Sequence, residues 1–301
     1  LAFWLGFLAR AFAFRGPPVL DRSRKGGARM MTGTDAPRRR IGGLVDHLRG
    51  PAAVVGGLAP ALHGARVALD PETQLRLLQN AAFVPARLWR LVAPEAIAAR
   101  IGAALREAPQ AGQAAAFWLG EGVAPWSVVT YAGLHVGWAH AISNGILIAL
   151  CGAPVARRLS ALRFVAFLTM GAAMGAAAQM SAVDAAFAPL VGASACVCAV
   201  IGALARAWTA PGGGLATSQA PPDSLGAALR RPQALAALAA GVVAILASAL
   251  AGEDAASIGW RAHLGGFLAG FFCFSALPAR RKTKHAQTCR SPRTDASSDS
   301  D

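Results

Sequence analysis

Six apolar runs, separated by polar segments, constrain the fold of this 301-residue chain more than any other feature. Five of them are about 20 residues long, the length that an α-helix needs to cross the hydrocarbon core of a bilayer. They cover residues 135–155, 162–182, 189–208, 234–251 and 258–277. The first run, 50–65, is shorter and rich in glycine and proline. We therefore expect an all-α membrane protein with six transmembrane helices, of which the first has the weakest signal.

The composition supports this expectation. Hydrophobic residues make up 55% of the chain and charged residues 15%, against about 25% charged in a typical soluble protein. This excludes disorder for most of the chain and disfavours a soluble globular fold. The five cysteines show neither the framework of a disulfide-rich domain nor the spacing of a zinc site. We expect neither a metal ion nor a cofactor.

The net charge of +14 lies in short clusters between the apolar runs. A nucleic-acid-binding protein would gather its charge on one folded face, so no nucleic-acid partner is expected. The clusters are Arg38–Arg40, Arg157–Arg158 with Arg163, Arg230–Arg231, and Arg280–Lys284. Six membrane passes place all four on one side, which the positive-inside rule assigns to the cytoplasm, together with both termini.

These assignments divide the chain into three parts. Residues 1–49 form a cytoplasmic N-terminal segment, in which 1–29 are interpreted as a spurious extension or a leader. Residues 50–277 form the membrane domain, with 70–131 as a large outer loop that contains an amphipathic stretch at 93–108. The polar tail 278–301 lacks periodicity, so we expect it to be disordered.

Polar side chains inside the apolar runs are costly and often functional, and four of them matter for the argument. They are His140, Asn144, Ser194 and His263. Each alone is compatible with an ordinary hydrogen bond between helices. Measured from the starts of their runs, the two histidines and the serine lie about 7–8 Å deep on the same side of the membrane. A hydroxyl, an imidazole and a His/Asn pair in one layer are the groups that acyl transfer requires.

Small residues surround two of these side chains. Gly192 precedes Ser194, and Gly266 and Gly270 follow His263 at intervals of three and seven residues. The spacing of the last two glycines lets a neighbouring helix approach closely, although it is also common in membrane helices without any catalytic role.

Five segments of the chain match, in order, the sequence motifs of a known family. They are Asn80–Arg87, Trp126–Tyr131, His135–Asn144, Val191–Ser194 and Ala262–Gly266. Over roughly residues 75–277 the chain resembles the bacterial rhomboids, a family of intramembrane serine proteases. The resemblance implies a six-helix core in which Ser194 is the nucleophile and His263 the general base. His140 and Asn144 would form the oxyanion hole with the Ser194 backbone N–H, and His135 would help to hold the outer loop.

The resemblance further implies a hydrolase of the bacterial inner membrane that needs no aspartate. Its substrates would be single-pass membrane proteins, cut within the bilayer near its outer face. Two positions depart from the family pattern. Ala195 replaces a glycine, and Cys198 replaces a tyrosine that often stacks on the catalytic histidine. We expect the last helix to pack against Ala195 and the additional methyl group to be accommodated.

These departures support an alternative, a catalytically inactive rhomboid-like protein that binds membrane-protein clients. A small transporter is a third hypothesis, but the chain shows no internal repeat of the kind common in transporters.

Overall fold

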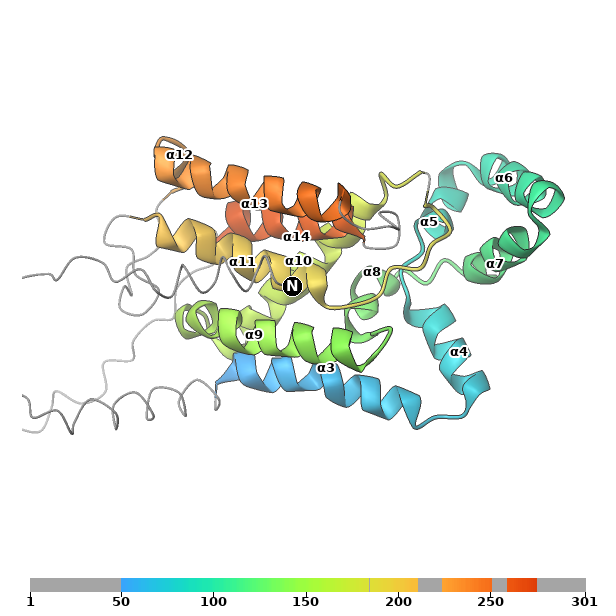
Figure 1. Ribbon diagram of the computed structural model, residues 1–301, viewed down its shortest axis with the longest axis horizontal. Coiled ribbons are helices and arrows are strands. Elements are labelled where there is room, and N and C mark those ends of the chain that lie inside the picture. The colour runs from blue at the N-terminus through green and yellow to red at the C-terminus, as the bar shows by residue number, and fades with distance from the viewer. Residues whose placement is uncertain (1–49, 184, 211–223, 251–258, 275–301) are drawn as a thin grey trace, which may run out of the picture.

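The computed structural model describes residues 50–183, 185–210, 224–250 and 259–274, and within these residues the fold is helical (Figure 1). Each of the six apolar runs contains one helix of a bundle. The six are α3 (Pro51–Val67), α9 (Trp138–Arg158), α10 (Ala161–Gln179), α11 (Ser194–Trp208), α13 (Pro232–Leu250) and α14 (Trp260–Cys273). By length and composition, α9, α10 and α13 are able to cross a membrane, and α11 is a shorter apolar helix.

Helices α3 and α9 pack together at a pair of glycines. A Cβ atom added to Gly56 would overlap the carbonyl oxygen of Gly145, and one added to Gly145 would lie 3.3 Å from the Cδ of Pro60. The absence of side chains therefore lets the two backbones approach. The glycines and the proline that weakened the sequence signal of the first helix are the residues through which it packs.

Helices α11 and α14 form another close contact through glycines. A Cβ at Gly266 or Gly270 of α14 would overlap the carbonyl oxygen of Ala195 or Ala199, respectively. In the opposite direction, a Cβ at Gly202 of α11 would overlap the carbonyl oxygen of Phe267. Three glycines thus bring the two backbones into direct contact over two helical turns.

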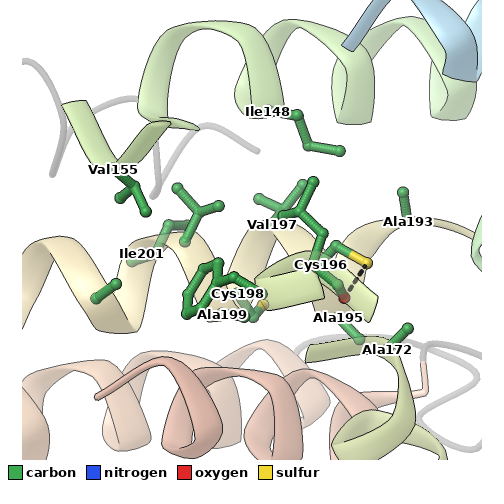
Figure 2. Packing of buried hydrophobic residues seen from close by; sticks show 14 of the residues in the cluster. Ile148, Val155, Ala172, Ala193, Ala195, Cys196, Val197, Cys198, Ala199 and Ile201 are labelled. Carbon is green, nitrogen blue, oxygen red and sulfur yellow. Dashed lines mark hydrogen bonds between the residues drawn. The ribbon is translucent and has the colours of Figure 1, made fainter. Parts of the chain in front are cut away.

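Helix α11 contacts α9 and α10 with different side chains (Figure 2). Val197 points toward Ile148 of α9, whereas Ala195 lies beside Ala172 of α10. Cys196 donates a hydrogen bond from Sγ to the carbonyl oxygen of Leu168, at 3.3 Å. Every residue of α11 from Ala195 to Ala207 is buried, so this helix is the centre of the bundle.

Between α3 and α9 the chain forms a group of helices that lies beyond one end of the bundle (Figure 1). The four longest are α4 (Pro71–Ala81), α5 (Pro85–Val92), α6 (Pro94–Glu107) and α7 (Pro109–Leu119), and a single turn, α8 (Ser127–Thr130), follows them. Each of the four begins with proline, which fits the first position of a helix because its missing N–H has no acceptor there. The stretch 93–108, expected to be amphipathic, forms α6.

The predicted start of α11 was wrong. The run 189–208 becomes helical only at Ser194, because Gly192 has a φ of +113° and Leu190 pairs with another segment. Between α11 and α13 the described residues include a short helix, α12 (Leu225–Leu229). The predictions for 1–49 and 278–301, including their basic clusters, concern residues outside the described part of the chain.

The contact between α11 and α14 leads to a stability prediction. Gly270→Ala places a methyl group on the carbonyl oxygen of Ala199, so we expect a loss of about 1–3 kcal/mol in the free energy of unfolding. Gly57→Ala is the matched control, because no atom lies within 4 Å of its added Cβ. Denaturation in mixed detergent micelles measures both variants, and equal stability would contradict the packing described here.

Candidate active site

The side chains of Ser194 and His263 meet in the structure. The Nε2 atom of His263 lies 2.8 Å from the Oγ of Ser194. Ser194 is the first residue of α11 and His263 lies in the first turn of α14. Because the glycine contacts fix these two helices against each other, the distance between the serine and the histidine depends on the backbone packing.

Three hydrogen-bonded contacts hold the non-helical segment that leads into Ser194. Leu190 exchanges both backbone hydrogen bonds with Phe83, at 3.1 and 2.7 Å. The N–H of Gly192 donates to the carbonyl oxygen of Tyr131 at 2.9 Å. The N–H of Ala193 donates to Nε2 of His135 at 3.4 Å. The position of the serine is thus determined by segments that lie far from it in the sequence.

Gly192 is required by its backbone conformation and by its neighbour. Its φ of +113° lies in a region that residues with a Cβ rarely adopt. An added Cβ would also lie 2.5 Å from the Cε1 of His140. The imidazole of His140 therefore packs directly on the backbone that precedes Ser194.

Asn144 lies one helical turn beyond His140 on α9. Its side chain is buried, and Nδ2 donates a hydrogen bond to the carbonyl oxygen of His140 at 3.0 Å. A carboxamide nitrogen carries two hydrogens. One N–H therefore anchors the side chain to its own helix, and the second is available to a group in front of it.

A cavity of about 560 Å³ connects these groups. His140, Asn144, Ser194 and His263 all line it, as does the segment 188–191. Because Ser194 begins α11, its N–H has no acceptor within the helix, and the first turn carries a partial positive charge. The cavity thus contains a hydroxyl in contact with an imidazole, near several donors suited to a developing negative charge.

Three helices start later than the sequence predicted. The helices begin at Trp138, Ser194 and Trp260, not at the starts of the apolar runs. His140, Ser194 and His263 still share a layer, because each lies within the first turn of its own helix. The two glycines of α14 that were expected to allow close packing contact α11, as described above.

Two features of the cavity were missed in the sequence. Gln179, the last residue of α10, lines the cavity and is only 3% exposed. Its Oε1 has no hydrogen-bond partner among the described residues. The cost of a polar side chain in an apolar run would have singled it out. The pairing of Phe83 with Leu190 could not be predicted in the same way, because both side chains are apolar and the contact is made by backbone groups.

The structure also accounts for the methyl group of Ala195. It faces α10, where a Cβ added to Gly175 would lie 2.6 Å from it. Helix α14 instead packs on the backbone of Ala195 through Gly266. The methyl group is thus accommodated, as expected, but the space for it comes from Gly175 of α10 and not from α14. Cys198, one helical turn after Ser194 on α11, also lines the cavity.

Within the described residues, no three His, Cys, Asp or Glu side chains are close enough to hold a metal ion.

A comparison with protein families matches residues 124–279, more than half of the chain, to the Rhomboid domain. Searches of curated proteins and of solved structures give no match. The rhomboid family comprises intramembrane serine proteases and inactive relatives, which act on membrane proteins within the bilayer. The chain belongs to the rhomboid family of integral membrane proteins.

Proposed function

We propose that this chain is an active intramembrane serine endopeptidase that cleaves the transmembrane segments of single-pass membrane proteins. The observation that carries the proposal is the 2.8 Å contact between Ser194 Oγ and His263 Nε2 inside a cavity lined by His140 and Asn144. An inactive, client-binding relative has no need to keep a nucleophile and a base in contact.

In the proposed mechanism, Ser194 Oγ attacks the carbonyl carbon of the scissile peptide bond while His263 Nε2 accepts its proton. The tetrahedral oxyanion is stabilised by the side chains of His140 and Asn144 and by the Ser194 N–H. The C–N bond then breaks, and His263 returns the proton to the leaving amine. Water, deprotonated by the same histidine, hydrolyses the acyl-enzyme.

The proposal includes a topology. The six helices of the domain 50–277 cross the bacterial inner membrane, with both termini in the cytoplasm. The helices α4–α7 then form the large outer loop, and the cavity opens near the outer face. Figure 1 supports this arrangement, because successive bundle helices run in opposite directions and α4–α7 lie beyond one end.

Labelling with a fluorophosphonate probe tests the proposal, because the probe reacts only with an activated serine. We expect the native protein to be labelled and Ser194→Ala to remain unlabelled. If the native protein is as inert as Ser194→Ala, the proposed activity is wrong and the client-binding alternative replaces it.

The same probe tests whether an alanine at position 195 lowers the reactivity of Ser194. Because Gly175 already accommodates the methyl group, Ala195→Gly should change the labelling rate by less than about tenfold, or about 1.4 kcal/mol. Native, Ala195→Gly and Ser194→Ala proteins are compared in liposomes. Labelling of Ala195→Gly alone would show that the alanine inactivates the natural chain.

The topology is tested with cysteines introduced at two exposed arginines, in a background in which Cys273 and Cys289 are serine. Arg100→Cys in α6 should react with a membrane-impermeant maleimide added to intact cells. Arg230→Cys, next to α12, should react only after the cells are permeabilised. Equal labelling of the two in intact cells would contradict the six-pass arrangement.

A further inference from the structure

Helix α3 carries two polar side chains to which neither the resemblance nor the proposed mechanism assigns a role. His63 is 2% exposed, and its ring packs edge-on against Trp138 with the ring centroids 4.9 Å apart. Arg66 lies one turn further along the same face of the helix and is partly buried. Buried polar groups are retained only where they have partners, so the partners of this pair are informative.

Both side chains meet at a single atom, the backbone carbonyl oxygen of His135. His63 Nδ1 lies 3.1 Å from that oxygen, and Arg66 Nη2 lies 3.2 Å from it. Because a carbonyl oxygen only accepts hydrogen bonds, Arg66 donates to it, and His63 donates to it in the tautomer that carries the hydrogen on Nδ1. Arg66 Nη2 also lies 3.4 Å from His63 Nδ1. Arg66 is held in turn by Gln74 of α4, whose Oε1 accepts from Nη1 at 3.2 Å.

The residue held in this way is the one whose ring reaches the serine loop. The Nε2 atom of His135 accepts the hydrogen bond from the N–H of Ala193, directly before Ser194. The ring also packs edge-on against His140, with the ring centroids 5.1 Å apart. His135 is 1% exposed, so any shift of its backbone is transmitted to Ala193 and His140.

We infer that His63 and Arg66 are positioning residues. By holding the backbone of His135, they fix the conformation of the segment 191–194 and the orientation of the His140 ring. Neither side chain lines the active-site cavity, so both act through His135. Their effect on catalysis rests on the proposed function, whereas their effect on the loop does not.

The variants are chosen to separate a lost hydrogen bond from a lost side chain. His63→Leu and Arg66→Met remove the donors and keep apolar volume. His63→Asn retains an N–H near the position of Nδ1, and Arg66→Lys retains a cationic donor. Arg76→Met is the matched control, because Arg76 is exposed on α4 and pairs with Glu72.

Hydrogen–deuterium exchange of the full chain in lipid nanodiscs measures the loop directly. In His63→Leu and Arg66→Met we expect faster exchange of the peptide covering 188–197, whose amides at Gly192 and Ala193 are protected by hydrogen bonds. The peptide covering α10 should be unchanged. His63→Asn, Arg66→Lys and Arg76→Met should exchange as the native protein does.

Kinetics on a reporter membrane substrate measure the consequence. We expect each donor-free variant to lower kcat about tenfold and to change KM less than about twofold, because the reacting groups are misplaced while the substrate contacts remain. The conservative variants should restore kcat to within about threefold of native.

The outcomes separate the two proposals. Unchanged exchange of 188–197 in both donor-free variants overturns the inference, and so does a uniform rise across the whole chain. If exchange responds locally but the native protein is inert to the fluorophosphonate, the role of the pair in the loop stands and the proposed protease activity fails. If exchange responds and kcat does not, the pair holds the loop without influencing catalysis, which overturns the positioning role.

Discussion

Ser194→Ala and His263→Ala are each expected to abolish cleavage of a reporter membrane substrate while the protein still inserts and folds. The loss of a nucleophile or of its general base typically lowers the rate by about 10⁴–10⁶. The two groups act as a unit across their 2.8 Å contact, so the double variant should be no slower than either single variant. The fold should survive, because α11 and α14 are held by glycine contacts that neither substitution touches.

Ser181→Ala is the matched control for the serine, because Ser181 is exposed and its hydroxyl donates only to the carbonyl oxygen of Ala178. It should cleave at the native rate. Cleavage is followed by gel in liposomes, and thermal unfolding confirms that each variant is folded. Undiminished cleavage by Ser194→Ala or by His263→Ala would refute the assignment of that residue.

The second large effect concerns the proposed oxyanion donors. Asn144→Ala and His140→Ala should each lower kcat by about 10²–10³, the usual effect of removing one donor, and change KM much less. The reason is that these groups face the cavity and would strengthen their contact as the negative charge develops. A change confined to KM would make that residue a substrate contact instead.

Ile142→Ala controls for disturbance of α9, because Ile142 lies between the two donors in the sequence and its side chain is 44% exposed. It should retain the native kcat. A loss in Ile142→Ala as large as in Asn144→Ala would point to a general disturbance of α9 and contradict a specific role for the donors.

Hydropathy predicted which segments are helical because burial in a bilayer demands long apolar runs. It could not predict where α11 begins. Residues 189–193 are apolar or small, and they leave the helix because of a positive φ at Gly192 and a hydrogen-bonded pairing with Phe83. The pairing joins segments that are more than 100 residues apart, and the N–H of Gly192 bonds to Tyr131, which is also distant in the sequence. A local pattern contains neither contact.

The candidate site residues stood out in the sequence because ionisable and polar groups are rare inside apolar runs. Gln179 was passed over, although the same reasoning applies to it. The sequence also could not say which helix faces the methyl group of Ala195, since α10 and α14 both offer glycines at suitable spacing. Only the three-dimensional arrangement distinguishes Gly175 from Gly266 as the neighbour of that methyl group.

The glycine contact between α11 and α14 has a consequence for how the protein responds to membranes of different thickness. A helix that is longer than the hydrocarbon core is thick can adjust by tilting. Two helices whose backbones touch through Gly202, Gly266 and Gly270 must tilt together, so Ser194 and His263 keep their separation. Helix α9 meets α11 through side chains such as Ile148 and Val197 and not through glycines. We therefore expect bilayer thickness to affect the alignment of His140 and Asn144, the proposed oxyanion donors, more than the distance between Ser194 and His263.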